Sequence, residues 1–376
     1  MSNATPNLAL RQKTTADVLT GCTEVKELED GYALKYPKTS TWSGKLDAFT
    51  EAWRKSSPNM TFELVERDDS SSVWLEIRGP EGTKPFVEGA RYMLMSHLNP
   101  AMTTGYRLRH GMRYLTSPLR VLPDFLIIGA KKCGTTALYN YLTQHPAIAP
   151  ALKKEIYFFN AYFGKGKLWY KAFFPTVFEK FAAKTLGGRQ FLTGEATPDY
   201  LYLDDCPAKV AQTTPNARLI AILRNPIDRA YSFYNHNLRA GLETLSFEEA
   251  IDQEEQRLAD ERVRFAADPS LIRFHTMHHS YKLRGVYVDQ LKTWTDVFPR
   301  DQLLVLKTED QFLEPEQTLR RAFEHLGLEY HAPEAFKKIN TAPYSDMDPA
   351  VREKLSAYFE PHNQRLYDYL GTDLAW

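Results

Sequence analysis

Apolar and polar residues alternate in the first part of the chain, and this pattern predicts a small layered unit. Three alternating runs predict half-buried strands: 31–37, 61–67 and 72–79. Apolar residues recur at helical spacing in two places, at Leu46, Phe49 and Trp53 and again over 83–97. The resulting order β-α-β-β-α indicates a small α+β domain over 31–98. No set of residues in it suggests catalysis, so we expect it to pack, to shape a substrate site or to dimerise.

Continuous apolar runs replace the alternating ones from residue 123 onward. Three such runs predict strands that are buried on both faces: 125–130, 217–223 and 302–307. Each is followed by a helical pattern, one through Ala137, Leu138, Tyr141 and Leu142, one from Asp228 and one from Glu314 to Gly327. Alternating buried strands and helices are typical of a parallel sheet between two helix layers. We therefore predict an α/β three-layer sandwich with a central parallel sheet over 123–376.

The remaining stretches complete the predicted organisation. Residues 1–30 are expected to be an N-terminal tail and 99–122 a linker. An acidic amphipathic helix is predicted over 246–262, beginning at a capping box formed by Ser246 and Glu249. The segment 348–370 predicts one or two helices, divided near a proline.

Composition narrows the class of protein. The 376 residues carry 47 Lys+Arg and 47 Asp+Glu, and zero net charge argues against nucleic-acid or membrane binding through bulk basicity. Cys22, Cys133 and Cys206 are too few for a disulfide scaffold and form no zinc pattern. Without a signal-peptide pattern or a long apolar run, we expect a soluble cytoplasmic protein with neither nucleic acid nor membrane as a partner.

The segment between the first buried strand and its helix carries the chemistry of an anion site. Gly129 to Thr136 reads GAKKCGTT, which places glycines, a lysine and two hydroxyls at a helix N-terminus. Backbone N–H groups and the helix dipole favour a bound phosphate there. An ATP-binding loop would read GxxxxGK[ST], whereas here the lysine lies inside the loop. The segment is P-loop-like, and its displaced lysine indicates a different anhydride that needs no metal.

Two ordered motifs resemble those of sulfotransferases that use 3′-phosphoadenylyl sulfate (PAPS). LPDFLIIGAKKCGTTALYNYLTQHP, followed by KKEIYFF, resembles the family's 5′-phosphosulfate region, and LIAILRNPIDRAYSFYNH resembles its 3′-phosphate motif. GEATPDYL and RGVYVDQLKTW extend the resemblance from residue 123 to the C-terminus. It is nearest to the heparan-sulfate-sulfotransferase-like and the bacterial carbohydrate and natural-product branches. It implies transfer of a sulfuryl group from PAPS to a hydroxyl or amine of a carbohydrate or small natural product, releasing PAP without a metal.

The resemblance also implies roles for individual residues. The donor would be bound by residues of the loop and of two later segments: Lys131, Lys132, Cys133, Gly134, Thr135, Thr136, Arg224, Ser232, Arg284 and Gly285. Lys132 would stabilise charge on the bridging oxygen as its bond to sulfur breaks, while Lys131 would be solvated or steer the donor. Arg224 and Ser232 would clamp the 3′-phosphate.

Glu155 lies where the heparan-type branch carries its catalytic base, and Lys154 matches the lysine beside that base. Neighbouring lysines keep such a carboxylate ionised, so it can accept a proton from the acceptor. A histidine is the rival base, and His275, His278 and His279 precede the RGVY motif.

The GEATPDYL segment departs from the heparan branch, because Ala196 stands where that branch has a lysine. Glu195 is expected to be structural or, in a kinase, a metal ligand, and Asp199 and Tyr200 are expected on the acceptor side. A P-loop nucleotide kinase and a non-catalytic PAP-binding module are the alternative functions. A homodimer through the N-terminal domain is one arrangement open to the chain.

Overall fold

The computed structural model describes residues 18, 22–56, 60–66, 71–79, 87, 103–185, 187–188, 190–240, 242–267, 274–336 and 345–376. They form two compact units. One comprises residues 1–103 with 234–280, and the other comprises 104–233 with 281–376.

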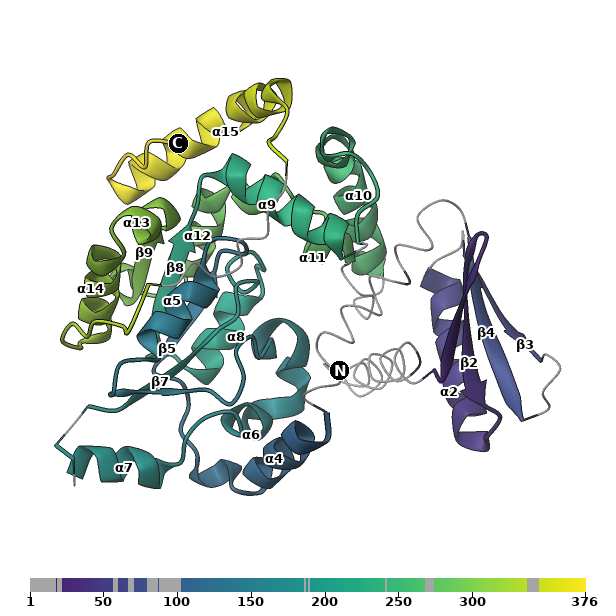
Figure 1. The fold of residues 1–376 in the computed structure, drawn as a ribbon, viewed down its shortest axis with the longest axis horizontal. Helices are drawn as coiled ribbons and strands as arrows, with labels where there is room; N and C mark the ends of the chain where they lie inside the picture. The colour runs from purple at the N-terminus through teal and green to yellow at the C-terminus, as the bar shows by residue number, and fades with distance from the viewer. Residues whose placement is uncertain are drawn as a thin grey trace. The chain divides into compact units, whose positions relative to one another are not determined.

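The N-terminal residues of the first unit form a four-stranded antiparallel sheet with a helix (Figure 1). Its elements are β1 (Glu24–Leu28), β2 (Gly31–Pro37), α2 (Ser40–Ser56), β3 (Thr61–Val65) and β4 (Ser72–Arg78), and the strand order is β1-β2-β4-β3. The three predicted strands and the first helix are confirmed. β1 lies in the stretch expected to be a tail. A five-residue strand at a sheet edge needs few apolar residues, so the sequence pattern did not indicate it. Apart from Val87, which is buried, the predicted helix over 83–97 lies outside the described residues.

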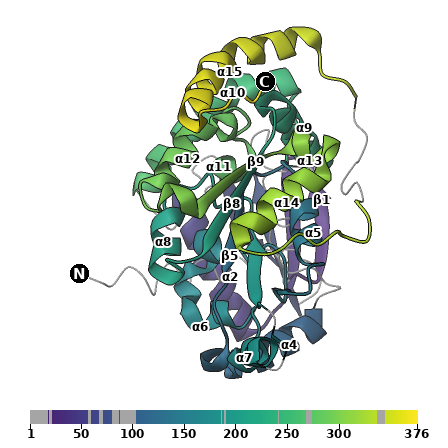
Figure 2. The same cartoon turned by 90° about the vertical axis from the view of Figure 1, so that its left-hand side faces the viewer.

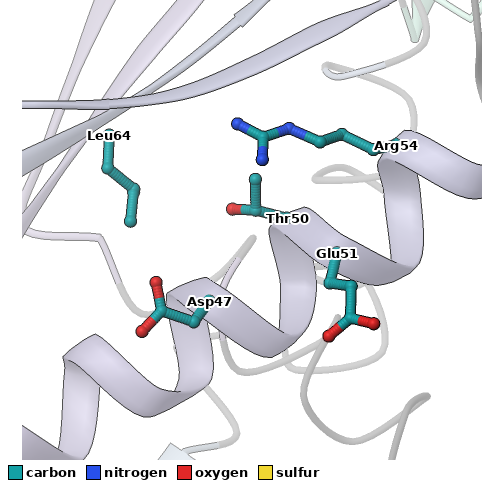
Figure 3. Close-up of a pocket in the computed structure, with 5 residues that line it drawn as sticks. All are labelled: Asp47, Thr50, Glu51, Arg54 and Leu64. Carbon is teal, nitrogen blue, oxygen red and sulfur yellow. The ribbon is translucent and has the colours of Figure 1, made fainter.

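The core of this sheet lies between the strands and α2. Leu34, Leu46, Phe49, Phe62 and Leu75 are all buried there. A cleft of about 480 Å³ lies at the edge of this layer, lined by Asp47, Thr50, Glu51 and Arg54 of α2 and by Leu64 of β3 (Figure 3). The Arg54 guanidinium donates to the Phe62 carbonyl at 2.7 Å, so its charge helps to join helix and strand.

The same unit contains the helices α10 (Phe247–Ala267) and α11 (Phe274–His278). The predicted capping box begins α10: Ser246 N–H donates to Glu249 Oε2 at 2.9 Å and Glu249 N–H donates to Ser246 Oγ at 3.3 Å. The Glu261 carboxylate accepts from the His275 N–H at 2.6 Å and thereby joins the two helices.

The second unit is built on a five-stranded parallel sheet of order β6-β7-β5-β8-β9. The strands are β5 (Phe125–Gly129), β6 (Ile148–Pro150), β7 (Leu192–Ala196), β8 (Arg218–Leu223) and β9 (Leu303–Lys307). The helices α5 (Thr135–Leu142) and α14 (Pro315–Leu326) cover one face, while α8 (Cys206–Thr213) and α12 (Tyr287–Thr295) cover the other (Figure 2). This arrangement confirms the predicted fold class.

Further helices surround the sheet: α4 (Thr103–Leu115), α6 (Gly166–Lys171), α7 (Val177–Thr185), α9 (Pro226–Arg239), α13 (Thr308–Leu313) and α15 (Pro349–Leu370). A π-helical turn, η3, spans Phe158–Tyr162, and short 3₁₀ turns span Ser117–Leu119 (η2), Phe163–Lys165 (η4), Leu283–Gly285 (η5) and Arg300–Gln302 (η6). α4 lies in the stretch expected to be a linker. α15 continues through Pro361 as a single helix. None of the described helices is long and apolar enough to cross a bilayer.

Candidate active site

The GAKKCGTT segment forms a tight turn between β5 and α5, as the sequence predicts. β5 is buried throughout, and Gly134 begins α5 from a left-handed conformation with φ of 87°. Lys132 also has a positive φ, 71°, which costs a non-glycine residue about 1–3 kcal/mol. The first N–H groups of α5 have no acceptor within the helix and are available to an anion. The loop is held from behind by Thr308 Oγ1, which donates to the Cys133 carbonyl at 2.7 Å.

Tyr287 connects this loop to the end of β8. Its hydroxyl donates to the Arg224 carbonyl at 2.9 Å and lies 3.7 Å from Cys133 Sγ. Burial raises the pKa of the Cys133 thiol to about 11, so it stays protonated at neutral pH. The Cys133 side chain is fully buried and packs inside the loop. Tyr287 thus joins the two segments whose motifs were predicted to hold the two phosphate groups of the donor.

Arg224 and Ser232 lie at the turn from β8 into α9. Asn225 Oδ1 accepts from the Ile227 N–H at 3.0 Å and caps α9, so the helix begins two residues before its predicted start. Arg224 is half-buried, and its guanidinium makes no ion pair or hydrogen bond with any residue that the structure describes. Ser232 lies two turns into α9 and is 9% exposed.

Glu155 is held between a cation and a hydroxyl. Lys154 Nζ donates to Glu155 Oε1 at 2.5 Å, and the Tyr157 hydroxyl donates to Glu155 Oε2 at 2.5 Å. Burial alone would raise the pKa of Glu155, but Lys154 and the Tyr157 hydrogen bond outweigh it and hold the pKa below its ordinary value. Glu155 and Tyr157 both adopt left-handed backbone conformations, with φ of 60° and 57°. Such strain persists only where the surroundings enforce it.

The GEATPDYL segment enforces this backbone. It accepts from four consecutive N–H groups: Glu155 to the Ala196 carbonyl at 3.1 Å, Ile156 to Glu195 Oε2 at 3.4 Å, Tyr157 to Thr197 Oγ1 at 3.4 Å and Phe158 to the Tyr200 hydroxyl at 2.9 Å. The candidate base is therefore positioned by β7 and the turn after it. This role was not predicted; the polar side chains of Glu195, Thr197 and Tyr200, close together in one motif, were its signal in the sequence.

Glu195 is a structural carboxylate. It is fully buried and accepts from the hydroxyls of Tyr170 at 2.7 Å, Thr197 at 2.6 Å and Tyr200 at 3.0 Å. Burial raises its pKa despite these hydrogen bonds. Because both oxygens are occupied by protein donors, the arrangement favours the structural role over the metal-ligand role. Tyr200 takes part in this network, although it was expected on the acceptor side.

Asp199 forms ion pairs with two cations, Lys131 of the phosphate loop and Arg284. Arg284 Nη1 lies 2.8 Å from Asp199 Oδ1, and Lys131 Nζ lies 3.4 Å from Oδ2. Burial alone would raise the pKa of Asp199, but the two cations lower it below its ordinary value. Lys131 Nζ also lies 5.0 Å from the centroid of the Phe233 ring. Lys131 was expected to be solvated or to steer the donor; its side chain is 18% exposed and paired with Asp199, so it is not fully solvated, and the steering role stays a prediction.

Arg284 and Gly285 are engaged in packing. The Arg284 guanidinium lies over the Tyr202 ring, 4.4 Å from its centroid, in addition to its ion pair. A Cβ at Gly285 would come within 2.7 Å of the Phe359 ring, so close packing against α15 requires glycine there. The predicted contact of these two residues with the 3′-phosphate stays a prediction.

The candidate histidines belong to the first unit, whereas Glu155 belongs to the second. The rings of His275 and His279 face each other, with 2.7 Å between their Nδ1 atoms. His279 Nε2 lies 2.8 Å from the Leu242 carbonyl oxygen, and burial lowers the His279 pKa. Both rings are thus engaged within their own unit.

Comparisons with known proteins identify the family of this chain. A sulfotransferase domain model matches residues 122–347, more than half of the chain. The membrane-associated sulfotransferase kil1 of Dictyostelium discoideum is 28% identical over 69% of this chain and 67% of its own length. Heparan sulfate glucosamine 3-O-sulfotransferase 6 of Mus musculus is 26% identical over 73% of this chain and 80% of its own length.

A solved structure extends the agreement to the fold. A sulfotransferase from Alicyclobacillus acidocaldarius is 31% identical, with a TM-score of 0.51, over 68% of this chain and 98% of its own. The family model, the curated relatives and this solved structure all carry the name sulfotransferase. The chain belongs to the sulfotransferase family and is a sulfotransferase.

Proposed function

We propose that this sulfotransferase moves the sulfuryl group of PAPS in line to a hydroxyl or amine of a carbohydrate or small natural product, with Glu155 as the general base. The observation that carries this proposal is the fixed position of Glu155. Four hydrogen bonds from the N–H groups of residues 155–158 hold its backbone, and contacts with Lys154 and Tyr157 hold its carboxylate. A fixed carboxylate that is deprotonated at neutral pH suits proton abstraction at a defined position.

The proposed step balances as follows. The acceptor oxygen or nitrogen attacks sulfur, the bond from sulfur to the bridging oxygen breaks, and PAP leaves with the electron pair. The acceptor proton goes to Glu155. Lys132 and the N–H groups at the start of α5 face the charge that develops on the leaving phosphate, which favours the transition state over the ground state. Lys154 stabilises charge on the sulfuryl oxygens. No residue role in this step requires a metal.

Arg224 and Ser232 are proposed to bind the 3′-phosphate. Arg224 supports this assignment because its guanidinium makes no ion pair with any described residue and stands at the carboxyl end of a parallel strand, where ligands bind in such sheets. A planar guanidinium binds phosphate through two parallel hydrogen bonds. This second phosphate distinguishes PAPS from ordinary adenine nucleotides.

Titration calorimetry with PAP, AMP and ATP·Mg²⁺ tests the donor assignment. We expect PAP to bind more tightly than AMP, and Arg224→Ala to weaken PAP binding by about ten- to hundredfold. Arg320→Ala is the matched control, since Arg320 is exposed and its ion pair with Glu316 lies on the surface of α14. Tighter binding of ATP·Mg²⁺ than of PAP would overturn the assignment and favour a kinase.

The acceptor class is proposed from the relatives and from one departure. The mouse relative is named for its action on heparan sulfate glucosamine, which favours a carbohydrate. Ala196 removes a cation that the resemblance would place near the acceptor, so we expect weaker selection for a polyanion. Transfer from PAPS to desulfated heparan oligosaccharides, amino sugars and phenols compares these classes directly. Turnover of phenols alone would overturn the carbohydrate preference.

A further inference from the structure

One end of the second unit combines exposed apolar side chains from three elements, two of them consecutive and one later in the chain. Met112 and Leu115 of α4, Leu119 of η2, and Val177, Phe178 and Phe181 of α7 are all exposed, Leu115 by 82% and Phe181 by 66%. Single exposed apolar residues are ordinary, but a contiguous group of this size marks an interaction surface. We call these six residues the apolar face.

Backbone contacts hold the elements of the apolar face together. The Val121 N–H after η2 donates to the Pro175 carbonyl before α7 at 3.0 Å. Arg113 of α4 donates to the Ala172 and Phe174 carbonyls at 2.7 and 2.6 Å. Figures 1 and 2 both place α4 and α7 at the same end of the second unit. The exposed side chains therefore belong to one end of this unit.

The same segments are strongly basic. Residues 103–122 contain four Arg and no Asp or Glu, and residues 164–185 contain five Lys and one Glu. Arg109, Lys165, Lys167 and Lys184 are exposed. A surface that presents cations around apolar side chains is complementary to an anionic lipid headgroup layer above hydrocarbon.

The apolar face lies at the amino edge of the sheet, opposite the donor site. Lys180 of α7 pairs with Asp124 at 2.8 Å, and Asp124 immediately precedes β5. The phosphate loop follows the other end of that strand. A partner bound to the apolar face would therefore leave the donor site open.

We propose that the apolar face docks the enzyme on a membrane surface that contains anionic phospholipid. The basic residues supply attraction to the headgroups, and Leu115, Phe178 and Phe181 insert among the acyl chains. A polyanionic carbohydrate would account for the cations but gives no reason to expose large apolar side chains. Peripheral anchoring needs two signals of this kind, since one apolar group alone binds only weakly and reversibly.

Co-sedimentation with sucrose-loaded vesicles tests the proposal on the full chain. We expect binding to vesicles of phosphatidylcholine with about one third phosphatidylserine, and little binding to phosphatidylcholine alone. The variant Leu115→Ser/Phe178→Ser/Phe181→Ser should lower the vesicle partition coefficient by at least about tenfold. Leu313→Ser is the matched control, because Leu313 is 81% exposed but lies on α13. PAP binding and circular dichroism check that each variant is folded.

Three outcomes would overturn the proposal. The proposal is contradicted if the folded wild-type protein does not bind anionic vesicles, whether or not the protein binds a sulfated polysaccharide. Unchanged vesicle binding by the triple variant shows that adsorption needs only charge. A change in oligomeric state in the triple variant, without vesicle binding by the wild type, shows that the apolar face is covered by another part of this chain or by a second copy.

Discussion

Replacing Asp199 by asparagine removes one carboxylate from a buried cluster that holds two cations. Asp199 is 1% exposed, and Arg284 is 2% exposed. Asparagine has nearly the same size, so packing is kept while the charge is lost. Arg284 and Lys131 then repel each other without the anion between them.

The expected loss of stability is large because removing one partner leaves buried charge uncompensated. With an effective dielectric constant of about 20, attractions across 2.8 and 3.4 Å amount to roughly 6 and 5 kcal/mol. Relief of the carboxylate's own desolvation offsets part of this sum. Measured losses for one partner of a buried pair are about 3–5 kcal/mol, and we expect Asp199→Asn to fall in that range.

Urea denaturation, monitored by the hydrogen exchange of peptides from β5 and β8, measures the loss of unfolding free energy in this unit alone. Asp289→Asn is the matched control: Asp289 also pairs with an arginine, Arg365, but both side chains are about half exposed. That surface pair should contribute no more than about 1 kcal/mol. A loss in Asp199→Asn that is as small as in the control would refute the reasoning.

The pH dependence gives a second test of the same cluster. The folded-state pKa of Asp199 is lowered, so its stabilisation is complete above the unfolded-state pKa and disappears as the pH falls through the folded-state pKa. The stability difference between wild type and Asp199→Asn should therefore narrow below about pH 4. In the variant, the pKa of Lys131 should fall further, because burial lowers it and Asp199 opposes that effect.

Three further predictions concern the loop, the base and the sheet. Glu155→Gln should lower the rate of sulfuryl transfer by about 10²–10⁴-fold with PAP affinity unchanged, and a wild-type rate would favour a non-catalytic role. Buried Cys133, with a pKa of about 11, should be alkylated at pH 8 far more slowly than half-exposed Cys22, and peptide mass spectrometry that finds equal rates would contradict its burial. Gly194→Ala places a Cβ 2.6 Å from an aromatic ring of the neighbouring strand and should cost about 1–3 kcal/mol in urea denaturation, unlike Gly164→Ala, whose Cβ meets nothing within 4 Å.

The strands that could be predicted are those composed almost entirely of apolar residues, because that composition indicates burial on both faces. FLIIG of β5 and LIAIL of β8, after its exposed first residue Arg218, are apolar throughout because helices cover both faces of the sheet. β7 reads LTGEA and carries no such signal. It is nonetheless buried, because Gly194 makes room for an aromatic ring and Glu195 finds three hydroxyl donors elsewhere in the chain. Such compensation depends on tertiary contacts and has no periodicity in the sequence.

The candidate site divides in the same way. The phosphate loop and the Lys154-Glu155 pair depend on neighbours in sequence, so they were predictable as residues. Their positions depend on contacts across the fold, as in the four hydrogen bonds from residues 155–158 to the GEATPDYL segment. Lys131 shows the limit most clearly: its ion pair with Asp199, 68 positions later in the chain, has no signal in the residues around it.

Charge shows why whole-chain averages mislead about surfaces. The net charge of zero argued against a polybasic membrane protein. The segments 103–122 and 164–185 nevertheless carry nine basic residues and one acidic residue together. Residues 242–267 carry eight acidic residues and three basic ones, and they belong to the other compact unit. Screening confines electrostatic attraction to about 10 Å at ordinary salt, so a bound surface responds to the local excess and not to the sum. The expectation of no membrane partner rested on that sum and on the lack of a long apolar run, and neither describes the local charge of one surface.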